Sequence, residues 1–252
     1  MIIRRPWPYW LADGFVALAV LGWWFVARGM PDFALSGPWV TGVRLLALFT
    51  DPTFLGHTLA STLRVLLSVV LALAIGGGLA LLARGVPAFE WVVHHGAQPF
   101  FNSFPSIGWA ILAAIWFSPG HFSIVFVQVA ILIPFCLINI AQGLRELDRE
   151  LLEMGQSFTR SRPRLLALLT VPLLMPYVLG ALRIGYGIGW KIAIVAELLG
   201  STSGLGFLML RAQSSADVTT VMAACLAIVV LFVAGERLLI DPLARRWSAP
   251  AS

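Results

Sequence analysis

The sequence has few charged residues, few cysteines and a single lysine. Only 12% of its 252 residues are charged, whereas soluble domains carry about 25% charged residues. Cys136 and Cys225 lie in apolar stretches without C-x-x-C spacing, so we expect neither a disulfide nor a cysteine-bound metal. The one lysine, Lys191, also lies in an apolar stretch, and no G-x-x-x-x-G-K-[ST] motif occurs. A P-loop ATPase is therefore excluded for this chain.

Motifs for catalysis, metal binding and nucleic-acid binding are missing as well. The histidines show no H-E-x-x-H or comparable ligand spacing, so we expect no metal site. Residues 200–204 lack both the G-x-S-x-G pattern and a paired histidine, and we interpret them as a flexible loop. Basic residues are scattered rather than gathered into a patch with aromatics, which argues against nucleic acid as a partner. We expect no enzyme activity and no cofactor in this chain.

Apolar residues dominate the sequence. Hydrophobic residues make up 59% of it, and the mean hydropathy is +0.89. Several apolar runs reach the roughly 20 residues that a helix needs to cross a bilayer, and they are continuous rather than alternating, which favours helices over strands. We predict an all-α, polytopic membrane protein. Its bundle of about six transmembrane helices should lie near residues 10–27, 58–84, 88–117, 122–144, 165–199 and 218–240.

Prolines and glycines predict irregular points in the first half of the bundle. Pro99 and Pro105 should divide the third span into two pieces. The glycine triplet 76–78 in the second span should let a neighbouring helix approach closely. Residues 29–57 are rich in proline and glycine, and we interpret them as an extracytoplasmic loop that carries an interfacial helix near 39–50.

The last two spans contain prolines too. The fifth span is too long for one straight crossing, so its first part is expected to lie near the membrane surface until Pro172 or Pro176. The dipeptide Asp241-Pro242 should end the sixth span, because proline disfavours helical continuation.

The distribution of basic residues predicts the orientation. With the N-terminus inside, eleven arginines fall on the inner side and three on the outer side. Both termini and the segment 145–164 are then cytoplasmic. The first apolar run continues beyond the length typical of a signal peptide, so we expect it to remain as a span. We divide the chain into residues 1–57, an N-terminal span with its outer loop, and a membrane core of residues 58–246.

The segment 145–164 is a polar island between apolar spans. It holds nine charged residues, five of them arginine. Read as a helix, it places leucine, methionine and phenylalanine on one stripe and acidic residues on another. Pro163 predicts a break before the next apolar run. A short amphipathic helix in an aqueous loop is typical of a segment that docks to a partner protein. The apolar stripe consists of Leu147, Leu151, Met154 and Phe158.

The same segment resembles the EAA loop of ABC-importer permeases. In that family, E-A-A is followed by three residues, a glycine and, after a gap, an apolar-proline pair. Glu153 and the later Val171-Pro172 fit this pattern. Met154 and Gly155 stand where the family has two alanines, and Thr159 stands where it has glycine. The resemblance implies that this loop couples to an ATPase, through Leu147, Glu150, Leu151, Glu153, Met154, Gly155, Phe158 and Thr159.

Further segments resemble the nitrate/sulfonate/taurine/bicarbonate branch of this family. They are residues 106–110, 116–117, 180–183, 189–190, 196–197 and 204–206, and the resemblance covers roughly residues 58 to 246. It implies a type I ABC-importer permease in the bacterial inner membrane that imports a small anionic solute by alternating access. It also implies partners: a second copy of this chain, two cytoplasmic ATPase subunits that hold ATP and Mg²⁺, an extracytoplasmic substrate-binding protein and membrane lipid.

The fifth span contains small and charged side chains. Ala181, Gly185, Gly189 and Ala193 form a row of small residues that would let helices pack closely. A charge inside a membrane is costly unless it is paired or hydrated. We therefore expect Arg183, Lys191 and Glu197 at the translocation path or a dimer seam. The two glycines are candidates for the same place, but helix packing alone is the favoured interpretation for them. Snorkelling or a structural ion pair is the alternative for the charges, and Arg64 in the second span is interpreted as snorkelling.

Two other kinds of protein remain as alternatives. An ion-driven secondary transporter would need no ATPase partner, and an inverted internal repeat would favour it, but we find none. An intramembrane enzyme is disfavoured because no catalytic constellation is present. Three intramembrane cations against one acid indicate an anionic substrate.

Overall fold

The protein is described by a computed structural model that covers residues 8–31, 33–86, 91–92, 96, 98–147, 153–155, 157, 159 and 161–248. Helices and short connections make up this part of the chain, and it contains no strand. The helices are α1 (Pro8–Arg28), α2 (Pro38–Leu48), α3 (Pro52–Gly85), α5 (Gln98–Ser103), α6 (Ser106–Trp116), α7 (His121–Arg145), α9 (Arg162–Leu165), α10 (Val171–Gly200), α11 (Leu205–Ser214), α12 (Val218–Gly235) and α13 (Asp241–Ser248). Two wide π turns, η2 (Leu166–Thr170) and η3 (Glu236–Ile240), precede α10 and α13. The predicted all-α class is confirmed.

Among the described residues, four stretches of helix are long and apolar enough to cross a membrane. They are Pro52–Gly85, His121–Arg145, Ala167–Gly200 and Val218–Trp247, which correspond to the second, fourth, fifth and sixth predicted spans. The first predicted span forms the 21-residue helix α1. The third is divided, and its second piece is the 11-residue apolar helix α6.

Several predicted boundaries are corrected by the structure. The second span begins at Pro52 rather than near residue 58, because Asp51 caps it by accepting a hydrogen bond from the Thr53 N–H at 2.8 Å. Within the described residues of the third span, Pro105 marks the division, since it caps α6. Pro99 lies in the first turn of α5, where a missing N–H costs nothing.

The prediction that Asp241-Pro242 ends the sixth span is wrong. The helix continues through η3 into α13 and ends at Ser248. Within η3, the Asp241 N–H bonds to the carbonyl of Glu236, five residues earlier. This wide turn restarts the hydrogen-bond register, so Pro242 occupies the first turn of α13, where no donor is needed. Pro172 follows η2 in the same way, and Pro176 lies inside α10 without ending it.

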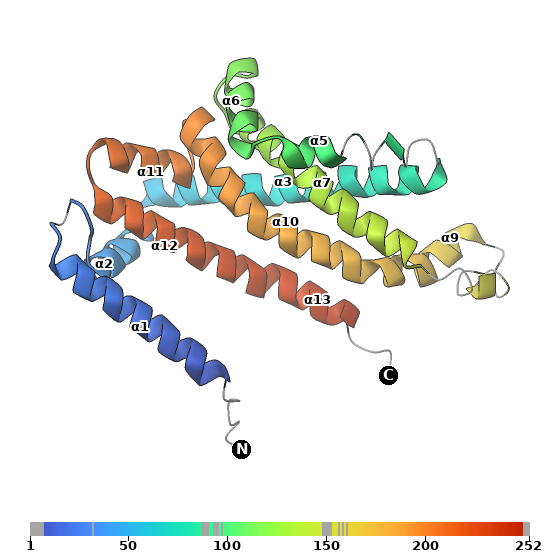
Figure 1. Cartoon of the computed structure of the whole chain (residues 1–252), viewed down its shortest axis with the longest axis horizontal. Coiled ribbons are helices and arrows are strands. Elements are labelled where there is room, and N and C mark those ends of the chain that lie inside the picture. The colour runs from blue at the N-terminus through green and yellow to red at the C-terminus, as the bar shows by residue number, and fades with distance from the viewer. Residues whose placement is uncertain are drawn as a thin grey trace.

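Helices α3, α7 and α10 pack together as the centre of the bundle. In Figure 1, α10 lies between α7 and α12, and α1 lies at the edge of the molecule beside α2. A Cβ atom on Gly76 would lie 2.9 Å from the Ile133 carbonyl oxygen and the Leu137 nitrogen of α7. The predicted close approach at the glycine triplet is confirmed at this position. By contrast, a Cβ on Gly78 would meet nothing within 4 Å.

The predicted interfacial helix forms α2, which packs against α12. The Arg44 Nε donates to the Thr220 hydroxyl at 2.9 Å, and the Thr220 hydroxyl donates to Asp217 at 2.6 Å. The guanidinium of Arg44 also lies 3.9 Å from the Asp217 carboxylate. This polar cluster fixes the loop before the second span to the start of the sixth.

Candidate functional site

The row of small residues in α10 faces the inside of the bundle. Ala181, Gly185, Gly189 and Ala193 are all buried. A Cβ on Gly185 would lie 3.6 Å from Val69, and one on Gly189 would lie 3.4 Å from Val65, both in α3 of the same chain. The two glycines therefore serve helix packing within one chain. This is the packing role favoured for them from the sequence, and a place at the translocation path or a dimer seam stays a prediction.

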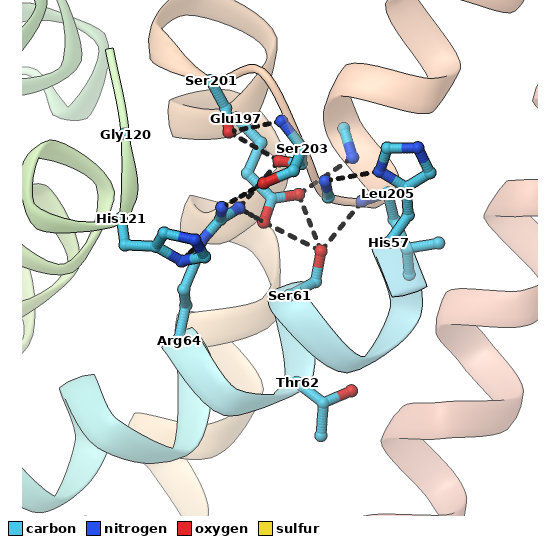
Figure 2. A network of polar contacts seen from close by, with 12 residues as sticks. His57, Ser61, Thr62, Arg64, Gly120, His121, Glu197, Ser201, Ser203 and Leu205 are labelled. Atoms are coloured by element: carbon cyan, nitrogen blue, oxygen red, sulfur yellow. Dashed lines mark hydrogen bonds and ion pairs between the residues drawn. The ribbon is translucent and has the colours of Figure 1, made fainter. Parts of the chain in front are cut away.

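Glu197 and Arg64 form a buried ion pair between α10 and α3. The Arg64 Nη1 lies 2.7 Å from the Glu197 carboxylate, and the two side chains are 2% and 0% exposed. Figure 2 shows them pointing toward one another from separate helices. The interpretation of Arg64 as a snorkelling residue is thus wrong, because its guanidinium points into the bundle. Glu197 is likewise buried within the bundle of this chain.

The ion pair also holds the connection between α10 and α11. Ser61 donates to the Glu197 carboxylate at 2.8 Å and accepts the N–H of Leu205 at 2.8 Å. Glu197 in turn accepts the N–H of Gly206 at 3.0 Å. Arg64 donates to the carbonyl of Ser203 at 2.8 Å and to its hydroxyl at 2.6 Å. Arg64 thus binds Ser203 within the segment that we interpreted as a flexible loop (Figure 2), and Glu197 binds the backbone that follows it.

Two histidines and a glycine complete this network. His57 Nδ1 accepts the N–H of Gly204 at 2.9 Å, and the Arg64 Nε donates to His121 Nδ1 at 3.1 Å. Gly204 has φ of +113°, and a Cβ there would lie 2.3 Å from the Glu197 side chain. Only glycine meets both conditions. Sequence reasoning missed this network; the signal that could have found it is a Gly-Leu-Gly segment a few residues after an intramembrane glutamate.

Arg183 and Lys191 lie on a different face of α10 from Glu197. Both side chains line a groove between α10 and α12 with a volume of about 510 Å³. Arg183 pairs with two acids, Glu236 at 3.2 Å and Asp241. Lys191 is exposed and forms no ion pair within the part of the chain that the structure describes. Of the three charges predicted at the translocation path or a dimer seam, Glu197 therefore belongs to the buried pair, whereas Arg183 and Lys191 line the groove.

The loop after α7 contacts the start of the fifth span through the helical residues 153–155, which are called the loop helix below. Glu153 and Met154 are exposed, whereas a Cβ on Gly155 would lie 2.6 Å from Leu165 and 2.9 Å from Leu169. A small residue is therefore required where the EAA pattern has its second alanine. Glu150, Leu151 and Phe158, which we predicted as coupling residues, lie outside the described residues.

Two further predicted coupling residues have clear environments. Leu147 is only 9% exposed and packs in the core cluster that contains Leu144 and Leu174. This corrects its assignment to an exposed docking stripe, because Leu147 lies two residues after the end of α7 and packs with the buried residues of that helix. The Thr159 hydroxyl accepts the N–H of Ser161 at 3.3 Å, so this side chain closes the turn after the loop helix.

Polar contacts tie the loop end of α7 to its neighbours. Arg84 of α3 donates to the carbonyl of Leu144, and Tyr177 of α10 donates to Glu146. The hydrogen bond from Tyr177 lowers the pKa of the Glu146 carboxyl, with a smaller contribution from Gln142. A Cβ on Gly143 would lie 2.5 Å from the Tyr177 ring. The absence of a side chain there lets Tyr177 lie against α7.

Comparison with known proteins identifies the family of this bundle. Residues 79–248 match the model of the binding-protein-dependent transport system inner membrane component, which is more than half of the chain. The chain belongs to this family of ABC-transporter permeases. The type I ABC permease fold and the multi-pass inner-membrane location follow, and the family is one of transport permeases rather than enzymes.

Relatives of this permease extend over most of its length. It is 29% identical over 237 residues to the taurine transport system permease protein TauC of Escherichia coli (strain K12). The alignment covers 88% of this chain and 82% of TauC. The chain is 29% identical over 231 residues to the riboflavin transport system permease protein RibX of Chloroflexus aurantiacus, covering 88% and 83%. The putative aliphatic sulfonates transport permease protein SsuC of Bacillus subtilis is 23% identical over 231 residues, covering 90% and 82%.

Proposed function

We propose that this permease is the translocation subunit of an ATP-driven importer for a small anionic solute. In this proposal two copies form a homodimer, each copy binds one cytoplasmic ATPase subunit, and ATP with Mg²⁺ is bound by those ATPases. A soluble protein outside delivers the solute, in keeping with the binding-protein-dependent family. The relatives' names point to taurine, aliphatic sulfonates and riboflavin, so the resemblance alone does not select the solute.

The observation that carries this proposal is the contact between the loop helix and the fifth span. Gly155 lies against Leu165 and Leu169, and these residues continue through η2 into α10. A force on the loop helix is therefore applied directly to the helix that carries Arg183 and Lys191. The exposed side chains of Glu153 and Met154 are free to contact an ATPase, as helix-in-groove recognition requires. We infer that ATP-driven closure of the ATPases moves this loop and switches the access of the bundle.

This function requires the loop and both termini to be cytoplasmic, as the arginine distribution predicts. Ser157 is exposed in the loop and provides a position for labelling. A Ser157→Cys variant, with the exposed Cys225 replaced by alanine, should resist a membrane-impermeant thiol reagent in intact cells and react in inverted vesicles. Labelling from outside would contradict this orientation.

The decisive test is affinity purification in mild detergent, with identification of the co-purified ATPase and measurement of its ATP turnover. A Glu153→Lys change should release the ATPase or uncouple its turnover from transport, while the permease remains folded in the membrane. Arg246→Glu is the matched control, because it also reverses one exposed charge but lies on α13. Unchanged ATPase association and turnover in Glu153→Lys would remove the support for coupling through this loop. Transport without any ATPase would instead favour a secondary transporter.

A further inference from the structure

The first turn of α11 is capped by side chains of two other helices. The N–H groups at positions 204, 205 and 206 each donate to one side chain, and the acceptors are His57 Nδ1 at 2.9 Å, the Ser61 hydroxyl at 2.8 Å and the Glu197 carboxylate at 3.0 Å. A helix start has no carbonyl of its own for these N–H groups. Three hydrogen bonds therefore hold the beginning of α11 on α3 and α10.

Two histidines of this network accept hydrogen bonds through Nδ1. His57 Nδ1 faces the N–H of Gly204, and His121 Nδ1 faces the Nε–H of Arg64 at 3.1 Å. A backbone amide and a guanidinium can only donate. Each Nδ1 must therefore carry a free lone pair, so both histidines are neutral in this arrangement (Figure 2).

A proton on either imidazole would break its contact. An imidazolium has two N–H donors and no acceptor. At His57 the added charge would also lie at the N-terminus of α11, where the helix dipole disfavours a cation. At His121 it would face the Arg64 guanidinium, which is buried in its ion pair. In both cases the network loses a contact on which the connection between α10 and α11 depends.

The charged groups near His57 are of both signs. Arg211 of α11 and Arg64 of α3 oppose a positive imidazole, whereas Asp51 at the start of α3 favours one. The Glu197 carboxylate of α10 is already bound by Arg64 and by the backbone of α11. The surrounding charges therefore provide no unoccupied partner that would replace the lost hydrogen bond to Gly204.

We propose that His57 and His121 form an acid-sensitive latch on the start of α11. With both imidazoles neutral, the connection between α10 and α11 is held on α3, and protonation of either side chain releases it. His57 is half-buried and His121 is exposed, so protons from the solution reach both. Histidine changes its charge between about pH 5 and 8. Because α11 joins the fifth span to the sixth, acid would loosen the link between these spans. The latch does not depend on the proposed import function, which ATPase co-purification tests separately.

Hydrogen–deuterium exchange of the full-length permease in lipid nanodiscs, read by mass spectrometry, tests the latch. The readout is the exchange of residues 204–206, corrected for the intrinsic effect of pH on exchange. For the parent we expect about fivefold faster exchange at pH 5.5 than at pH 7.5, the factor that corresponds to loss of one helix cap. Residues 220–224 in the first turns of α12 are the internal control and should not change, because their Asp217 cap loses its charge only below about pH 4.

Asparagine variants remove the titration but keep the hydrogen bond. The side-chain carbonyl of asparagine lies where histidine has Nδ1, and it accepts without taking up a proton. The double variant His57→Asn, His121→Asn should therefore exchange as the parent does at pH 7.5 and should not exchange faster at pH 5.5. His57→Leu has no acceptor, so its residues 204–206 should exchange about fivefold faster than the parent's at pH 7.5.

Three results would overturn the latch. One is a parent whose residues 204–206 exchange equally at both pH values, which requires no variant to fold. Another is an acid response in the double asparagine variant that is as large as the parent's. The third is equal acceleration at residues 220–224 of the parent, because acid would then unfold the bundle as a whole rather than release α11.

Discussion

The guanidinium of Arg64 and the carboxylate of Glu197 meet 2.7 Å apart, and both are shielded almost completely from solvent. They come from α3 and α10, and together with Ser61 they bind the backbone that leads into α11. A buried charge is tolerated when it is paired and its remaining hydrogen-bonding atoms are satisfied. The pair therefore determines the path of the chain where the fifth span ends.

Removing one member of this pair should destabilise the permease strongly. We expect Arg64→Met or Glu197→Met to lower the free energy of unfolding by about 3–5 kcal/mol, because each leaves an unpaired buried charge. The double variant should be more stable than either single variant. Thermal unfolding of the purified protein, followed by tryptophan fluorescence, measures this order. Single and double variants with additive losses would show that the two charges are not coupled.

The glycine triplet of α3 offers a graded test of helix packing. Gly76→Ala should destabilise the bundle, since its Cβ would lie 2.9 Å from backbone atoms of α7 that cannot move aside. Gly78→Ala is the matched control, as a Cβ there meets nothing within 4 Å; it should be neutral or slightly stabilising, given the higher helix propensity of alanine. Thermal stability in detergent distinguishes the two. Equal effects at both positions would argue against the close α3–α7 crossing.

Enlarging the side chain at the loop–span contact should disturb coupling without unfolding the bundle. Gly155→Leu would displace the loop helix from Leu165 and Leu169, because even a Cβ comes within 2.6 Å of the first. Gly155→Ala should be milder, since the atoms it meets are the mobile ends of leucine side chains. We expect reduced transport per ATP hydrolysed for the leucine variant, measured in proteoliposomes with the partner ATPase. Full coupling in that variant would show that this contact transmits no motion.

The Asp217 cluster predicts a pH dependence of stability. Burial acts to raise the pKa of the Asp217 carboxyl, but hydrogen bonds from Thr220 and the charge of Arg44 outweigh it and lower the pKa. A carboxyl with a lowered pKa stabilises the fold above its unfolded pKa of about 4, and this contribution is lost as the pH falls through the folded pKa. Asp217→Ala should cost about 0.5–2 kcal/mol at neutral pH through loss of the helix cap. The difference from the parent should shrink as the solution is acidified below about pH 4, and a constant difference would contradict this assignment.

The sequence predicted the helical class and most spans because apolar runs act over short stretches of chain. The cytoplasmic side of the loop, which rests on the arginine distribution, stays a prediction. The sequence could not predict which side of a span a charge faces. Arg64 and Glu197 are 133 residues apart, and nothing local to either indicates the other. The row at Gly185 and Gly189 was identified correctly as small, but its partner helix depends on the assembled bundle. Leu147 was placed on the wrong surface for the same reason.

The wide turns η2 and η3 change which faces of the fifth and sixth spans point in the same direction before and after each turn. Each turn adds one residue to the helical path, and one residue rotates the face of a helix by about 100°. Leu165, where the loop helix contacts the fifth span, lies before η2, and Lys191 lies after it. The direction in which Lys191 points around the helix axis therefore does not follow from that of Leu165 by counting 3.6 residues per turn. A sequence change within η2 could rotate the groove relative to the loop while leaving every contact on either side of the turn in place.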